Sequence, residues 1–183
     1  MKGWFVSFGA GLFTWTLMEY GVHEVLGHRP KGKTHASREH LAHHKDTSYF
    51  TPYAKKFLAA TPIVGTLGAG AAALVGPGRG IAYAAGVATG WAWYEVGHRR
   101  IHQRPPTTAY GRWMRRHHLH HHFGHPRANH GVVTSLWDHV FGTYQRPEQI
   151  RVPRRNVGEL PWITGGDPEG EVLPEHADGY RVV

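Results

Sequence analysis

Three segments of the chain contain no Asp, Glu, Lys or Arg, and they define its hydrophobic pattern. They are residues 4–18, 57–78 and 80–94. A helix rises about 1.5 Å per residue, so a full bilayer crossing takes about 20 residues. The second segment is long enough to cross, whereas the first and third are marginal. The pattern predicts an all-α, integral-membrane helical bundle of about three to four apolar helices.

The second and third segments are separated by Gly76-Pro77-Gly78-Arg79-Gly80, a sequence that breaks a helix. The pair should therefore form a helical hairpin that returns to the side it left. Gly and Ala are frequent in both segments. Glycine is costly in a water-exposed helix, but in lipid small residues let helices pack closely. Buried core helices of a soluble protein are the alternative, although the rest of the chain offers little apolar sequence to cover them.

The N-terminal segment superficially resembles a signal peptide, because Lys2 precedes an apolar run. No A-x-A-like cleavage site follows, and the run leads directly into Glu19 and His23. We expect an uncleaved membrane anchor.

Basic residues indicate the orientation and the domain organisation. Residues 29–56 and the chain after His98 are rich in Lys and Arg, which places them in the cytoplasm by the positive-inside rule. The histidine-rich parts should then form a helical cap on the cytoplasmic side. We expect residues 1–145 to form this membrane domain, and residues 146–183, rich in Pro and Arg, to form an irregular tail that wraps it.

Composition changes this picture in two ways. The mean hydropathy of −0.44 suggests a soluble protein, but polar histidine-rich stretches dilute the apolar segments. The net charge of +8 calls for an anionic partner, either nucleic acid or an acidic membrane face. Because the chain has no cysteine, disulfides, iron–sulfur clusters and thiolate zinc sites are excluded.

Histidine is the most informative residue type, with 17 copies in 183 residues. Ten of them fall into four clusters at the edges of the apolar segments. The clusters are His23-x4-His28, His40-x2-His43-His44, His98-x3-His102 and His118-x2-His121-His122.

These clusters have the chemistry and spacing of a metal site. Neutral imidazole is a strong ligand for iron, zinc and copper, and spacings of three and four residues share one helical face. Ten candidate ligands are too many for one ion and suit two adjacent ions with about five nitrogens each. His23 and His28 are five residues apart, which requires a helix end or a slight turn between them.

The remaining histidines fall outside this spacing. His120 should face away from His118 and His122, and we expect the others near the clusters to support ligands or to face solvent. These are His117, His125, His130 and His139, while His35 and His176 should lie on the surface.

The order of the clusters resembles the fatty acid hydroxylase superfamily of membrane di-iron enzymes, which includes sterol desaturases. Glu19-Tyr20 and Tyr94-Glu95 precede the first and third clusters, as in that family. Residues 131–143 are similar to its G-V-T-x-x-x-W-D-x-x-F-G-T stretch. The resemblance covers roughly residues 19–144.

The resemblance implies that all ten clustered histidines are metal ligands: His23, His28, His40, His43, His44, His98, His102, His118, His121 and His122. It implies two iron ions, with zinc as an adventitious substitute, and O2 as co-substrate. The implied reaction removes hydrogen from an unactivated C–H bond of a lipid, giving a hydroxyl or a double bond. Electrons would come from a ferredoxin or from cytochrome b5 with its reductase. No fused cytochrome b5 domain fits within this chain.

Two further expectations concern neighbours and substrate. Glu24, Glu39, Tyr94 and Glu95 could accept a hydrogen bond from a ligand's other ring nitrogen. Residues 102–106 match the H-Q-R-x-P sequence of carotenoid hydroxylases, but the W-D-x-x-F-G-T stretch favours an acyl lipid over a carotenoid or sterol.

Basic residues and histidine clusters leave two other classes open. A basic cytoplasmic face of Arg99, Arg100, Arg104, Arg112, Arg115 and Arg116 suits an acidic electron carrier or anionic lipid headgroups. A metal store or transporter would also use histidine clusters. A nucleic-acid binder would exploit the charge, but the apolar hairpin argues against it.

Overall fold

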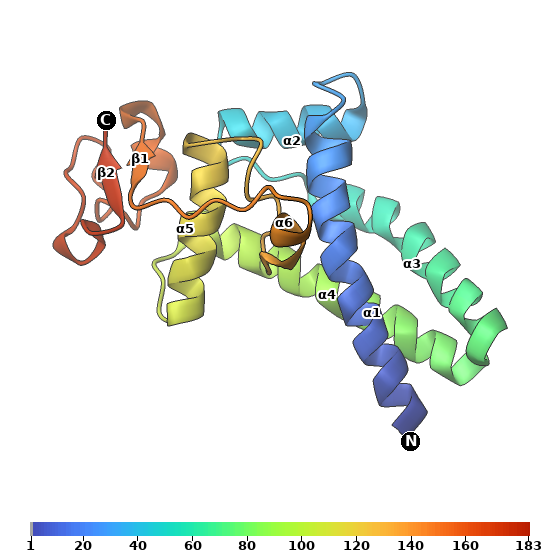
Figure 1. The fold of residues 1–183 in the computed structure, drawn as a ribbon. Coiled ribbons are helices and arrows are strands. Elements are labelled where there is room, and N and C mark those ends of the chain that lie inside the picture. Colours follow the sequence, from blue (N-terminus) through green and yellow to red (C-terminus); the bar gives the residue numbers. More distant parts are fainter. Residues whose placement is uncertain (1) are drawn as a thin grey trace. The chain divides into compact units, whose positions relative to one another are not determined.

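The computed structural model describes residues 2–183, and the chain is mostly helical (Figure 1). The longer helices are α1 (Lys2–Gly21), α2 (His35–Lys45), α3 (Tyr53–Val75), α4 (Pro77–Gln103) and α5 (Ala109–Phe123). The shorter elements are η1 (Val22–His28), α6 (Leu136–Val140), β1 (Ile150–Val152), η2 (Arg154–Glu159), η3 (Pro174–His176) and β2 (Tyr180–Val182).

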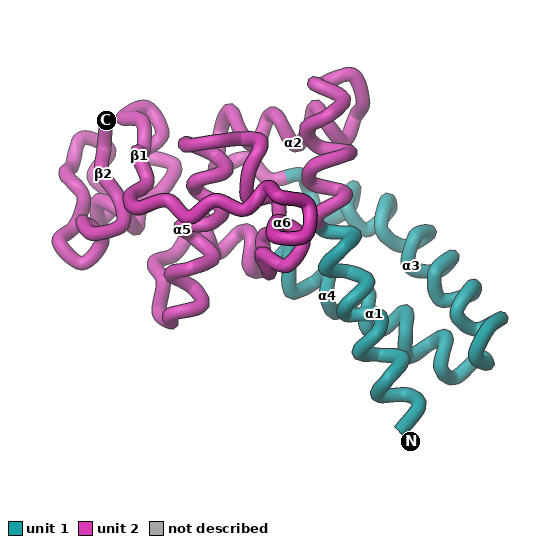
Figure 2. Tube along the Cα trace, viewed as in Figure 1, with its two compact units in different colours: residues 1–19, 51–95 teal, residues 20–50, 96–183 magenta. Residues whose placement is uncertain are grey.

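Compactness divides the chain into two units (Figure 2). Unit 1 consists of residues 1–19 and 51–95, and unit 2 consists of residues 20–50 and 96–183. The apolar helices belong to unit 1, and all ten clustered histidines belong to unit 2. The C-terminal tail belongs to the same compact unit as those histidines.

Helices α3 and α4 form an antiparallel hairpin within unit 1, as the apolar pattern predicts. Helix α3 ends at Val75, Gly76 has a φ of 92°, and Pro77 begins α4. A positive φ favours glycine, and proline is suited to the first helical turn. A Cβ on Gly68 would lie 2.8 Å from Ala84 Cβ. The small residues thus serve close helix packing.

The open end of this hairpin carries an ion pair. Lys56 Nζ lies 2.8 and 2.6 Å from the two carboxylate oxygens of Glu95. The Glu95 side chain is only 6% exposed, and the Lys56 ammonium balances its buried charge.

Helix α1 crosses α4 at two glycines in unit 1. A Cβ on Gly11 would lie 2.1 Å from the Tyr83 carbonyl oxygen, and one on Gly86 would lie 2.1 Å from the Phe8 carbonyl oxygen. Neither helix could approach so closely with a larger residue. The Tyr83 hydroxyl also donates a 2.9 Å hydrogen bond to Thr14 Oγ1.

The helices of unit 1 present large apolar side chains outward. Phe5 is 76% exposed, Leu58 80% and Leu74 87%. Among the described residues 2–183, α3 is the helix that is long and apolar enough to cross a membrane by length and composition. Such an outward apolar surface suits lipid better than water.

The tail departs from the expected all-α, irregular structure. Strands β1 and β2 pair in parallel, with Ile150 opposite Tyr180 and Val152 opposite Val182. Ile150 and Val152 are buried and Arg151 is exposed. Three residues are too few for this alternation to be recognised as a strand in the sequence.

Candidate metal centre

Unit 2 brings the ten clustered histidines together in two groups of five. Group A consists of His23, His28, His40, His44 and His121, and group B consists of His43, His98, His102, His118 and His122. In each group, the five ring nitrogens that face one another all lie within 4.8 Å. These are the groups of potential metal ligands found within the described residues 2–183.

Helices α2 and α5 each supply both groups. On α2, the first and third histidines of the H-x2-H-H motif, His40 and His44, belong to group A, and His43 belongs to group B. On α5 the division is reversed: His121 belongs to group A, and His118 and His122 belong to group B. The groups lie next to each other, and the His44 and His122 rings stack with centroids 4.2 Å apart. Each motif therefore serves two groups.

The spacing of His23 and His28 is explained by the local backbone. Residues Val22–His28 form a π-helix, in which hydrogen bonds run from residue i to i+5. Residues five apart therefore share a face, and the two ring centroids are 5.4 Å apart. The expected turn between these histidines is this widened helix.

Local capping fixes where the histidine helices begin. The Thr34 side chain accepts a hydrogen bond from the Ser37 backbone N–H, and the Thr108 side chain accepts one from Gly111. Threonine at this position satisfies an otherwise unpaired helix N–H. The Ser37 hydroxyl also donates to the Gly27 carbonyl at 2.6 Å, which joins α2 to the π-helix.

Distances between the facing nitrogens suit a common metal ion. In group A, His28 Nε2 lies 2.8 Å from His40 Nε2 and 2.9 Å from His121 Nε2. In group B, His118 Nε2 lies 3.1 Å from His102 Nε2 and 3.0 Å from His122 Nε2. Metal–nitrogen bonds of about 2.1 Å at right angles separate neighbouring ligand nitrogens by about 3.0 Å. Both groups therefore fit one ion each.

Backbone carbonyls fix the tautomers of three of these histidines. Nδ1 of His23 donates to the His130 carbonyl at 2.5 Å, and Nδ1 of His121 donates to the Ala128 carbonyl at 2.7 Å. Nδ1 of His43 donates to the Tyr49 carbonyl at 2.7 Å. A carbonyl only accepts, so in the neutral ring Nε2 keeps its lone pair for a metal.

Burial also keeps the rings neutral. It lowers the pKa of His23, His40, His102, His118, His121 and His122 well below the usual value, and neighbouring histidines lower it further. The same causes, burial first, lower the pKa of His44 to about 2, and burial lowers the pKa of His28 to about 4. Neutral imidazole is the form that binds metals.

The four residues expected beside the ligands make identifiable contacts of their own. The Glu24 carboxylate accepts a 2.8 Å hydrogen bond from Arg29, and Glu39 accepts one of 2.8 Å from the Tyr49 hydroxyl. In unit 1, Tyr94 packs against Trp15 with ring centroids 5.8 Å apart, and Glu95 binds Lys56.

The other histidines have different surroundings. His117 Nε2 lies 3.1 Å from Asp138 Oδ2, and His120 Nε2 lies 2.9 Å from Gln145 Oε1. His139 stacks on Tyr144 with centroids 4.0 Å apart. His35 and His125 are exposed, and His176 is half-buried against Trp162.

Two residues that sequence reasoning did not connect with the centre hold the end of α4, which carries His98 and His102. The Arg115 guanidinium donates to the carbonyls of Arg100 and Arg104, and Trp162 Nε1 donates to the His102 carbonyl at 3.1 Å. The sequence predicts Arg115 as part of a basic cytoplasmic face for an acidic carrier or lipid headgroups, but Arg115 is only 5% exposed. Its burial could have been expected from the sequence, because Arg115 lies on the same face of α5 as Met114 and His118.

The helical fold and the two adjacent all-histidine groups place this chain in the class of potential two-metal proteins. The family profile described as fatty acid hydroxylase matches residues 8–143. The chain belongs to the fatty acid hydroxylase family.

Curated relatives in plants, fungi and mammals are named as lipid hydroxylases. The chain is 31% identical over 150 residues to dihydroceramide fatty acyl 2-hydroxylase FAH2 of Arabidopsis thaliana, covering 77% of this chain and 60% of that one. It is 33% identical to ceramide very long chain fatty acid hydroxylase scs7 of Schizosaccharomyces pombe, covering 73% and 40%. For fatty acid 2-hydroxylase of Homo sapiens the identity is 30%, covering 74% and 38%. The chain thus spans less than two thirds of the length of these relatives.

A solved structure also has a similar fold. It is titled full-length scs7p, with only the hydroxylase domain visible. The TM-score is 0.63 at 28% identity, covering 80% of this chain and 57% of the other.

Proposed function

We propose that this protein is a membrane-bound, O2-dependent hydroxylase that holds two iron ions and acts on the acyl chain of a lipid. The observation that carries the proposal is the presence of two groups of five histidines with converging ring nitrogens. Family membership and the names of the relatives support lipid hydroxylation. The names of these relatives do not support desaturation of the same chain, or a sterol or carotenoid substrate.

All ten clustered histidines are proposed as ligands, with group A and group B holding one ion each. Imidazole binds iron, zinc, copper and nickel, so the donor set alone does not select the metal. Iron is proposed from the family, and zinc is expected as an adventitious occupant. Bound iron would supply the O2 activation that hydroxylation of a C–H bond needs.

The chain's own residues keep the donor nitrogens neutral, oriented and dry. His102, His118 and His121 are 0% exposed, so water has little access to their rings. The carbonyls of Tyr49, Ala128 and His130 hold three rings in the tautomer that leaves Nε2 free. The backbone thereby prepares both groups before a metal arrives.

The reaction needs an external reductant. Hydroxylation consumes one O2, two electrons and two protons, and it releases one water besides the alcohol. A ferredoxin, or cytochrome b5 with its reductase, is the proposed donor. Arg100, Arg104 and Arg112 are exposed and could bind an acidic carrier. Arg115 instead donates hydrogen bonds to backbone carbonyls at the end of α4.

The membrane arrangement is proposed from the apolar helices and the basic segments. Helix α3, with 23 residues, is about 34 Å long and matches the thickness of a bilayer. We propose that α1 and the apolar part of α4 also cross, and that the histidine groups lie on the cytoplasmic side. An acyl chain in the bilayer is a suitable substrate for such a protein.

Lipid mass spectrometry under 18O2 tests the proposed activity. Membranes containing the wild-type chain, its electron donor and iron should yield an 18O-labelled hydroxyacyl lipid. His121→Ala should reduce the labelled product at least 100-fold, because it removes a group A ligand. The matched control is His120→Ala on the same helix, which should keep most of the product because its ring contacts Gln145.

The same experiment separates the proposal from metal storage. Unchanged lipids with the wild type, together with reversible zinc binding, would favour a metal store or transporter. Equal loss of product in the two variants would contradict the assignment of His121 as a ligand.

A further inference from the structure

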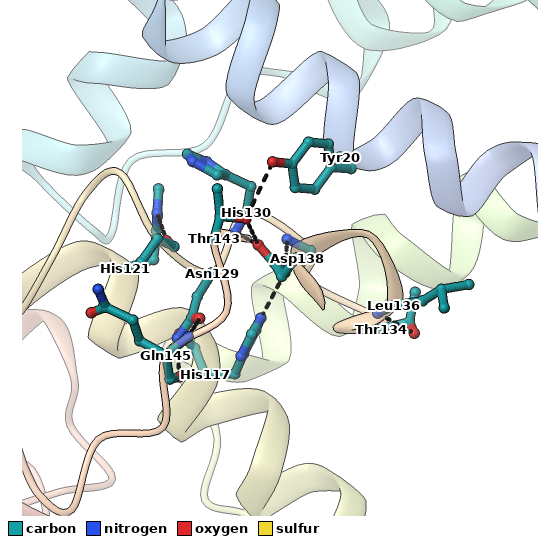
Figure 3. A network of polar contacts seen from close by, with 12 residues as sticks. Tyr20, His117, His121, Asn129, His130, Thr134, Leu136, Asp138, Thr143 and Gln145 are labelled. Carbon is teal, nitrogen blue, oxygen red and sulfur yellow. Dashed lines mark hydrogen bonds and ion pairs between the residues drawn. The ribbon is translucent and has the colours of Figure 1, made fainter. Parts of the chain in front are cut away.

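Asp138 lies at the centre of a buried polar network beside group A (Figure 3). Its side chain is 0% exposed and accepts four hydrogen bonds. Oδ1 accepts from the His130 backbone N–H and the Thr143 hydroxyl, each at 2.7 Å. Oδ2 accepts from the Gly131 backbone N–H at 2.9 Å and from His117 Nε2 at 3.1 Å.

This carboxylate holds the segment whose carbonyls contact candidate ligands. The His130 carbonyl accepts from His23 Nδ1, and the Ala128 carbonyl accepts from His121 Nδ1. Both histidines belong to group A. Asp138 therefore binds the backbone beside the His130 carbonyl, which contacts the candidate ligand His23. It makes this link through the backbone and not through a ligand side chain.

Asn129, between the two carbonyls, gives the segment an unusual conformation. Its φ is 58°, in the left-handed region that few residues other than glycine adopt. Its side chain accepts from the Gln145 N–H at 2.7 Å and donates to the Gln145 carbonyl at 2.9 Å. The segment is buried, so its polar backbone groups need these fixed partners. Asp138 and Asn129 together fix the directions of both carbonyls.

We propose that Asp138 is a positioning residue for the group A metal, acting through the backbone of residues 128–131. By binding the N–H groups of His130 and Gly131, it holds the carbonyls that orient the rings of His23 and His121. The inference rests on the proposed metal centre and goes beyond it, because it predicts that one side chain controls one of the two metals.

A carboxylate is required here because every neighbouring group donates. An isosteric amide would direct its own N–H2 toward two of these donors and lose the matching hydrogen bonds. In group B, the tautomer of His43 is fixed by the Tyr49 carbonyl, which lies outside residues 128–131. The effect of changing Asp138 should therefore be selective for group A.

The test measures the metal content and affinity of the purified, detergent-solubilised protein, loaded with Co²⁺ or Fe²⁺. The wild type should bind two ions per chain. Asp138→Asn should bind one ion as tightly as the wild type and the other about 10- to 100-fold more weakly, the range typical of residues that orient metal ligands. The visible spectrum of the weakened Co²⁺ site should also change.

Asp167→Asn is the matched control, because Asp167 is exposed and caps the Glu169 N–H in the tail. It should retain both ions. Thr143→Val removes only one of the four bonds and should weaken one ion by a smaller factor. This milder variant keeps the proposal testable should Asp138→Asn not fold.

The outcomes separate this inference from the proposed function. A wild type that binds no metal pair contradicts the metal centre itself. Two wild-type-like ions in Asp138→Asn, or in Thr143→Val when Asp138→Asn does not fold, overturn the positioning role alone. Equal weakening of both ions in a folded variant also overturns it.

Discussion

His130 shows how a residue can serve the centre through its backbone. Its N–H binds Asp138 and its carbonyl binds His23, whereas its buried Nδ1 has no hydrogen-bond partner within the described residues 2–183. Its ring centroid lies 5.1 Å from that of His121, yet the ring is outside both groups of five.

His130→Gln should therefore keep both metal ions, because the substitution leaves the backbone contacts in place. Metal content per chain and the Co²⁺ spectrum are the measurements. Loss of one ion would show that the ring itself is a ligand and that group A has six members.

At this scale the sequence predicts side chains better than backbone roles. The ten histidines could be selected by spacing because an imidazole pattern is visible in the residue types. The carbonyls of Tyr49, Ala128 and His130 could not be selected, because every residue has a carbonyl. Glu24 and Glu39, chosen for their chemistry, contact Arg29 and Tyr49, and their role beside the ligands stays a prediction.

At the scale of elements, glycine determines how α1 and α4 cross. Gly11→Ala would place a methyl group 2.1 Å from a backbone oxygen, and no rotamer change can relieve that overlap. The free energy of unfolding should fall by about 1–3 kcal/mol. Gly9 on the same helix has open space around its Cβ position, so Gly9→Ala should be neutral or slightly stabilising. Thermal unfolding in detergent compares the two variants, and equal unfolding temperatures would contradict the crossing.

The elements were predictable where composition was distinctive. The helical hairpin follows from glycine, proline and apolar runs, but the break is shorter than predicted: it is confined to Gly76, and residues 77–80 already belong to α4. The only sign of the π-helix at Val22–His28 was the five-residue spacing of His23 and His28, which does not place both residues on one face of an α-helix. The strands β1 and β2 carry no long pattern, because each has three residues and depends on pairing across the tail.

At the scale of the whole molecule, the proposed orientation places the breaker at residues 76–80 outside the cytoplasm and the basic segment 29–56 inside. The natural chain has no cysteine, so single cysteines can report this directly. In intact cells, an impermeant maleimide should label Arg79→Cys, and it should label Lys33→Cys only after permeabilisation. The reverse pattern would contradict the orientation.

The division of ten histidines into two metal groups is the central claim, and the metal-to-protein ratio tests it most directly. The wild type should hold two ions per chain. His28→Ala removes a group A ligand and His102→Ala removes a group B ligand, so each should retain one tightly bound ion, and the double variant should retain none. A ratio of one in the wild type, or loss of all metal in both folded single variants, would contradict two separate groups.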